Sequence, residues 1–250
     1  MSEKEIKLKP VSMFTITANL IHHIQHSVQE QLGEQGLQTF KEGISSFIDE
    51  QIQMIESAPC KYDIQESALY SHEKLLDPNK VEETYKQFID AQEKAGVSQP
   101  ISIYGLMAKI FAHIAKAVVD SYGKQGEEAM MNGVWTFGEE RGRNIAKRAL
   151  QMGKPNTLEN YLSHYDMGRS DLFEYETIHR SDEIEQTFTK CVFGDQWKKD
   201  GMGEYGILYC HMIDPSIAKG YNPDFKVVHD KYVLKEGCCH FLFQMEENRN

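Results

Sequence analysis

Side chains that can do acid–base or thiol chemistry gather in the C-terminal quarter of this 250-residue chain, where four of its five cysteines lie. Cys210 and Asp214 are four residues apart in segment 206–214, whose apolar spacing predicts a helix, so both project from one helical face. His211 adjoins them, and a thiol beside a carboxylate can serve as a nucleophile or a ligand. The spacing therefore predicts a thiol-and-carboxylate site. The alternatives are a buried structural thiol and a turn aspartate before Pro215.

The two segments that follow this helix predict a β-hairpin. Segments 225–234 and 238–245 are rich in β-branched and aromatic residues, and a glycine lies in the turn between them. Alternation along the second strand puts Cys238 and His240 on one face and Cys239 on the other. At most one of the adjacent cysteines can face the helix, and a register slip of one residue would exchange them.

Thiols from separate elements also allow a zinc site, as in many zinc proteins. The candidate ligands are Cys191, Cys210 and Cys239. No Cys-x-x-Cys pair accompanies them, and a reducing compartment disfavours a disulfide. Three histidines cluster nearer the N terminus, at His22, His23 and His26. Because no His-Glu-x-x-His motif accompanies them, they are interpreted as surface or interface residues.

Composition and charge exclude several kinds of partner. The net charge is -11, from 27 basic and 38 acidic side chains, and no basic block offsets it, which argues against nucleic acid and anionic membranes. The odd cysteine count and the charged first residues predict reduced thiols in the cytoplasm. No apolar run of about 18 residues could span a bilayer. We expect a cytoplasmic protein that acts on a small-molecule substrate, and a homo-oligomer is left open.

The N-terminal half contains an internal duplication with an offset of 90 residues. From Pro10 to Glu50, twelve of 41 positions are identical to the residue 90 positions later, without a gap. The aligned features predict, in each copy, a helix that begins after a serine cap, stops at a glycine and is followed by a second helix that packs back on it. We expect the two helical hairpins to pack about a local two-fold axis and form a helical platform.

The hydrophobic period changes from helix to strand after the second copy. A short helix is expected after Asn156, and segments 172–178 and 187–193 alternate as strands do. Helices followed by an antiparallel sheet predict an α+β fold. The expected domains are residues 1–98, the N-terminal helical copy, and residues 99–250, the second copy with a C-terminal α+β module.

The last helix of the second copy carries candidates for substrate binding. Arg141 and Arg143 lie close in sequence to Trp135, and a guanidinium fork binds a substrate carboxylate well. His240 of the terminal strand is a further candidate. The alternative is that the arginines belong to a solvated helix face.

Four strings of this sequence resemble the L-2-amino-thiazoline-4-carboxylic acid hydrolase family, over roughly residues 100–245. They are FGEERGRNIAKRAL at 137–150, YCHMID at 209–214, YNPDF at 221–225 and GCCHF at 237–241. The N-terminal copy lies outside the resemblance, so the duplicated half departs from a minimal member of the family.

The resemblance implies hydrolytic opening of a cyclic amidine at a C–N bond, such as conversion of 2-amino-thiazoline-4-carboxylate to N-carbamoyl-cysteine, with no organic cofactor. Cys210 is then the nucleophile or polarises water, and Asp214 is the general base or orients it. Cys239 supports the site or ligates a metal, and His211 or His240 carries a proton to the departing ammonia.

Two other kinds of function are left open. Paired cysteines on a terminal strand after a helical platform also resemble the 4-vinyl reductase type of small-molecule-binding domain, which would sense a ligand without turning it over. The third candidate is a zinc-stabilised scaffold, which metal content would reveal. Loss of Cys210 or Asp214 should stop catalysis, whereas a packed binding pocket would tolerate either loss.

Overall fold

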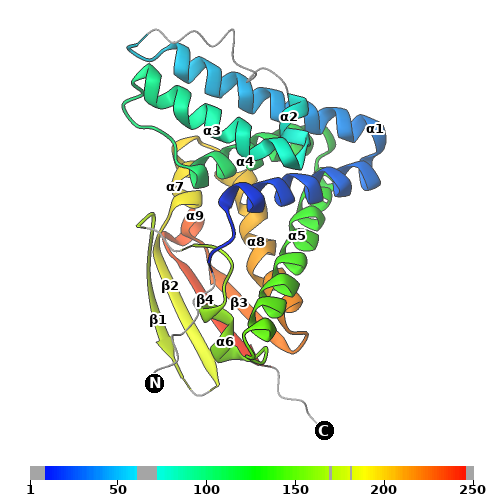
Figure 1. The fold of residues 1–250 in the computed structure, drawn as a ribbon. Helices are drawn as coiled ribbons and strands as arrows, with labels where there is room; N and C mark the ends of the chain where they lie inside the picture. Colours follow the sequence, from blue (N-terminus) through cyan, green and yellow to red (C-terminus); the bar gives the residue numbers. More distant parts are fainter. Residues whose placement is uncertain (1–8, 61–71, 169–170, 181, 246–250) are drawn as a thin grey trace.

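A helical layer sits above a small sheet, and two long helices descend from that layer, one packed on the sheet and the other packed on the first helix (Figure 1). The computed structural model describes residues 9–60, 72–168, 171–180 and 182–245. The helices are α1 (Met13–Glu56), α2 (His72–Leu76), α3 (Pro78–Ala95), α4 (Ile103–Tyr122), α5 (Lys124–Gln151), α6 (Leu158–Ser163), α7 (Val192–Lys199), α8 (Gly203–Tyr221) and α9 (Val233–Glu236). The strands are β1 (Phe173–His179), β2 (Glu183–Cys191), β3 (Phe225–Lys231) and β4 (Cys239–Met245). The predicted α+β class is confirmed.

Each copy of the duplication forms two helical arms that meet at a glycine. Ser12 and Ser102 cap the first arms, and each hydroxyl accepts a hydrogen bond from a backbone N–H of the first turn. The arms meet at Gly33 (φ 70) in α1 and at Gly123 (φ 55) between α4 and α5. Such positive φ angles suit glycine, which has no Cβ. Figure 1 shows α1 as two arms joined at a sharp bend, so the predicted order of helix, glycine and second helix is confirmed. The predicted packing is different, because the second arm packs mainly on the other copy and not back on its own first arm.

The second arm of each copy packs on the first arm of the other. A Cβ added to Gly43 would lie 2.7 Å from the Cα of Ile114, and a Cβ added to Gly133 would lie 2.7 Å from the Cα of Ile24. These four positions align in pairs at the offset of 90. A local two-fold axis requires such reciprocal contacts. The two glycines, which have no Cβ, let the helix backbones approach closely.

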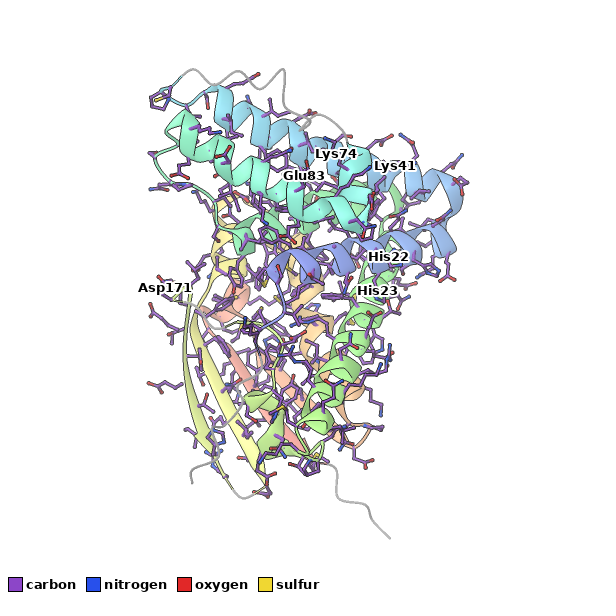
Figure 2. The ribbon with its side chains drawn as sticks, in the orientation of Figure 1. His22, His23, Lys41, Lys74, Glu83 and Asp171 are labelled. Carbon is purple, nitrogen blue, oxygen red and sulfur yellow. The ribbon has the colours of Figure 1, made fainter. Side chains whose placement is uncertain are left out.

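Polar contacts repeat the same exchange between copies. His23 Nε2 lies 2.9 Å from Glu140 Oε2, and His113 Nε2 lies 2.7 Å from Glu50 Oε2. The hydroxyls at the other ring nitrogens also align: they belong to Thr136, at 3.0 Å, and Ser46, at 3.1 Å. Figure 2 labels His23 close to α5. His23 is therefore an interface histidine, as predicted.

Filling either glycine contact should destabilise the protein. Gly43→Ala and Gly133→Ala each force a Cβ against a helix backbone, and overpacking of this kind costs about 1–3 kcal/mol. Urea unfolding should show similar losses for the two variants, because their environments are related by the two-fold axis. The matched control is Gly203→Ala, whose new Cβ would lie 3.6 Å from its nearest neighbour. Losses no larger than that of the control would contradict the close packing.

A buried lysine joins the first copy to the C-terminal part of the chain. The ammonium nitrogen of Lys109 lies 2.9 Å from Glu50 Oε1 and 2.8 Å from Asp200 Oδ2, at the end of α7. Burial favours the neutral form of Glu50, but hydrogen bonds from His113 and Lys109 lower its pKa to about 2. Lys109 belongs to the second copy, and the aligned position in the first copy is Asn19. Asn19 has no ammonium group with which to make an equivalent bridge.

The antiparallel sheet has the order β1-β2-β4-β3 and departs from the predicted segments in two places. Segment 225–234 ends as a strand at Lys231, and α9 forms before the turn at Gly237 (φ 80). The strand predicted at 187–193 begins earlier and ends at Cys191, where α7 starts. Four residues of that segment pair with β1, so its prediction as a strand is confirmed in part.

The structure shows which of the two adjacent cysteines is buried at β4. Cys239 is buried and pairs with Phe188 of β2, whereas Cys238 is half-buried and precedes the strand.

Helix α8 continues through Pro215 to Tyr221, so the interpretation of Asp214 as a helix-ending turn residue is wrong. Within the part of the chain that the structure describes, no helix has the length and apolar run needed to cross a membrane.

Candidate functional site

A cavity of about 150 Å³ lies between α8 and the inner face of the sheet. Twenty residues line it, and nine of them are Phe or Tyr. The polar members are Arg141, Gln186, Cys191, Cys210, Asp214, His229 and Cys239. A cavity of this volume can hold a ligand about the size of benzene. The site therefore suits a single small ring among aromatic walls.

Three cysteines from three elements meet at this cavity: Cys191 from β2, Cys210 from α8 and Cys239 from β4. All three are free thiols. Burial raises the pKa of Cys191 to about 11 and that of Cys239 to about 12. Burial, reinforced by the neighbouring cysteines, also raises the pKa of Cys210 well above its usual value. The thiols are therefore protonated near pH 7, the form that is the weaker nucleophile.

Metal binding by these thiols stays a prediction. Among the described residues, no three His, Cys, Asp or Glu side chains are placed as ligands of one metal ion. Zinc binds deprotonated thiolates, whereas these thiols are neutral near pH 7. They would lose their protons only through the charge of a bound metal.

Asp214 and His229 supply the acid–base groups of the cavity. Asp214 lies one helical turn from Cys210 on α8, and burial raises the pKa of its carboxyl to about 6, an effect that Arg141 partly opposes. Burial lowers the pKa of His229 to about 4. At pH 7 the pair is therefore mainly a carboxylate and a neutral imidazole. His229 Nδ1 lies 3.9 Å from Asp214 Oδ2, beyond a direct hydrogen bond.

His229 is the residue that the sequence analysis missed. Its side chain is only 3% exposed, and neither ring nitrogen makes a hydrogen bond of good geometry among the described residues, although the nearby backbone of Cys210 and of Lys231 acts to raise its pKa. The ring lies between Tyr232 and Phe241, with both centroid distances 4.0 Å. Buried polar groups are nearly always hydrogen-bonded. The unsatisfied imidazole therefore marks a place where a ligand can bind. Alternation from Phe225, which is buried, would have placed His229 on the inner face.

Arg141 reaches the cavity from α5, but its fork is occupied. Nε and Nη2 of Arg141 donate to the two oxygens of Asp166 over 3.0 and 2.6 Å, and both side chains are buried. The guanidinium also lies over the rings of Phe137 and Tyr165, at 5.5 and 5.6 Å. The Asp166 loop is held by its carbonyl, which accepts a 2.7 Å bond from the N–H of Val11. Asp166 thus takes the position predicted for a substrate carboxylate.

Two predicted histidines do not line the cavity. His211 follows Cys210 by about 100° around the helix and packs edge-on to Tyr232, with ring centroids 5.0 Å apart. His240 alternates to the outer face of β4, where Nδ1 lies 2.6 Å from Asp230 and Nε2 lies 3.1 Å from Glu185. Helical and strand periodicity therefore turn both rings away from Asp214.

Arg143 and Trp135 also lie outside the cavity lining. The Arg143 side chain is 54% exposed and its guanidinium lies 3.8 Å from Glu139, as the alternative of a solvated helix face predicted. Trp135 is half-buried on α5, six residues before Arg141. Of the predicted site residues, the structure brings together Arg141, Cys191, Cys210, Asp214 and Cys239.

Comparison with known proteins identified one family. The family model described as L-2-amino-thiazoline-4-carboxylic acid hydrolase matches residues 104–243, more than half of the chain. The match begins in α4, ends in β4 and contains every lining residue of the cavity, whereas α1, α2 and α3 lie outside it. Searches of curated proteins and of solved structures found no match.

Proposed function

This chain belongs to the L-2-amino-thiazoline-4-carboxylic acid hydrolase family, and from that premise we propose that it hydrolyses a cyclic amidine in the cavity between α8 and the sheet. The observation that carries the proposal is the half-buried carboxyl of Asp214 at the cavity, whose pKa is raised to about 6. A general base works best when its pKa lies near the working pH. Asp214 has this property and faces a cavity of suitable size.

The atoms of the product decide which bond breaks. Water adds to C2 of a 2-amino-thiazoline, the carbon bonded to the ring sulfur and to two nitrogens. N-carbamoyl-cysteine keeps both nitrogens on that carbon and has a free thiol, so the bond that breaks is C2–S. The C–N cleavage and departing ammonia expected from the resemblance do not give this product. The leaving group is sulfur, and it needs a proton.

Asp214 is assigned both proton transfers. Its carboxylate accepts a proton from the water that attacks C2, and the resulting acid returns the proton to the sulfur as the C2–S bond breaks. The second proton of the water passes from the new hydroxyl to the ring nitrogen as the carbonyl forms. Atoms and charge then balance, because amidine plus water equals carbamoyl amine plus thiol. His229, neutral and without a protein partner, is assigned a hydrogen bond to the amidine nitrogen or to the new oxygen. It takes the place of His211 and His240, which lie outside the cavity.

Water is preferred to Cys210 as the nucleophile. The Cys210 thiol has a pKa well above its usual value, so a carboxylate with a pKa of about 6 is a poor base for it. Cys210 and Cys239 then shape the cavity as neutral thiols. This assignment keeps Cys210 beside the reacting carbon without making it form a covalent bond.

Turnover of 2-amino-2-thiazoline and of its 4-carboxylate tests the proposal. Mass spectrometry should find a product heavier by one water, with one free thiol per turnover and no ammonia. Cys210→Ser should keep kcat within about tenfold of the wild-type value. A loss as large as that of Asp214→Asn would instead identify Cys210 as the nucleophile. Binding without any ring opening would favour the sensing domain of the 4-vinyl reductase type.

A further inference from the structure

The charges and rings of the cavity define the ligand more narrowly than the reaction does. We propose that it binds a protonated amidine carried on an apolar, aromatic body, and that it discriminates against ligands with a free carboxylate. The choice of an amidine as the cationic group rests on the proposed function. The preference for a cation and for an apolar body rests on the lining residues alone.

Asp214 is the unbalanced charge of this site. Of the described residues that line the cavity, only Arg141 and Asp214 belong to the Lys, Arg, Asp and Glu types. The charge of Arg141 is neutralised by Asp166 through two hydrogen bonds. The neighbouring His229 is neutral near pH 7, because burial lowers its pKa to about 4. The lining therefore carries one net negative charge, which a cationic ligand would compensate.

A ligand carboxylate has no comparable place. It would meet Asp214 as a like charge in a poorly solvated cavity, where repulsion is stronger than in water. Nε and Nη2 of Arg141 already donate to Asp166, so that edge of the guanidinium is occupied and its positive charge is already paired. The carboxylate of the family's named substrate is thus the group that this cavity accommodates least well.

The spacing of the two polar acceptors suits an amidinium. Asp214 Oδ2 and His229 Nδ1 are 3.9 Å apart, and a planar amidinium presents two N–H groups side by side. One N–H can donate to the carboxylate and the other to an unprotonated ring nitrogen. Such a ligand would supply the partner that the buried imidazole lacks among the described residues.

The walls suit a flat apolar body and a planar cation. Phe173, Phe188, Phe241 and Phe243 come from three strands of the sheet, and Tyr161 and Tyr165 also line the cavity. Aromatic faces attract cations and stack on flat rings. The guanidinium of Arg141 already lies 5.6 Å from the centre of the Tyr165 ring. That contact shows that a planar cation packs against this wall.

Calorimetric titration with matched ligands tests the inference on the wild-type protein. Benzamidine and benzoate share a phenyl ring and differ in charge, and benzamidine should bind at least about tenfold more tightly. 2-Amino-2-thiazoline should bind about tenfold more tightly than its 4-carboxylate. Equal or tighter binding of the carboxylates, or no binding of benzamidine, would overturn the inference.

Variants connect the preference to one side chain. Asp214→Asn should reduce the ratio of benzamidine to benzoate affinity about tenfold or more, whereas the exposed control Asp224→Asn should leave it unchanged. A ratio that survives in Asp214→Asn would refute the role of this carboxylate. The binding results are independent of turnover. Cation preference without ring opening would refute the hydrolase proposal alone, and turnover with tight carboxylate binding would refute this inference alone.

Discussion

Replacing Arg141 by methionine should lower the free energy of unfolding by about 3–5 kcal/mol, because it leaves the charge of Asp166 buried without a partner. The side chains of Arg141 and Asp166 are only 6% and 4% exposed, so water cannot take the place of the guanidinium. The lost contact of that guanidinium with the Phe137 ring adds to the effect. Urea unfolding monitored by circular dichroism would measure the change.

Arg143→Met is the matched control, since it makes the same substitution two residues along the same helix. Its side chain is 54% exposed, and surface changes usually lie within about 0.5 kcal/mol. The double variant Arg141→Met with Asp166→Leu should recover much of the loss, because replacing a buried ion pair by apolar groups is often neutral. Equal effects of Arg141→Met and Arg143→Met would show that the buried pair contributes little.

Asp214→Asn should lower kcat by about 10²–10⁴-fold while making the folded protein more stable at neutral pH. The gain in stability follows from the raised pKa. A carboxyl with a pKa of about 6 in the folded state and 3.8 in the unfolded state binds its proton more tightly when folded. Its contribution to stability is full below pH 3.8 and is lost as the pH rises through 6, by about 3 kcal/mol for roughly two pKa units.

Unfolding and activity as functions of pH would check both halves of this prediction. The asparagine variant should be more stable than the wild type above pH 6, and the difference should disappear near pH 4. His229 titrates in the same range but is present in both proteins. The wild-type kcat/KM should rise with pH and level off above an apparent pKa near 6, whereas residual activity of the variant should lack this step. A variant that is inactive and less stable at pH 8 would indicate a structural role.

Most of the fold was predictable because the duplication aligns features that each have a physical meaning. Ser12 and Ser102 cap the starts of helices, as serine commonly does. Gly33 and Gly123 end the first arms with positive φ angles, which glycine adopts readily. The strands were predicted less well at their ends. Segment 225–234 reads as continuous strand from its side chains, yet α9 begins at Val233, because the hydrogen bonds of a short turn outweigh the strand preference of single residues.

The candidate site was predictable only in the parts that share one element. Helical spacing placed Cys210 with Asp214, and strand alternation separated Cys239 from His240. The pairing of Arg141 with Asp166 crosses 25 residues of chain, and Asp166 lies in a loop without a periodic pattern. No spacing rule reaches such a partner. His229 was within reach of alternation, but a histidine in an apolar strand is not by itself distinctive.

The exchanged arms also determine when the first copy can fold during synthesis. Ile24 packs on Gly133, and His23 bonds to Glu140, more than a hundred residues later. A nascent chain that ends before Gly133 therefore exposes the apolar face of its first arm to solvent or to a chaperone. The first copy cannot complete its core during synthesis until the second copy has left the ribosome. Contacts so distant in sequence slow folding, and duplication has thus turned two local hairpins into one long-range folding unit.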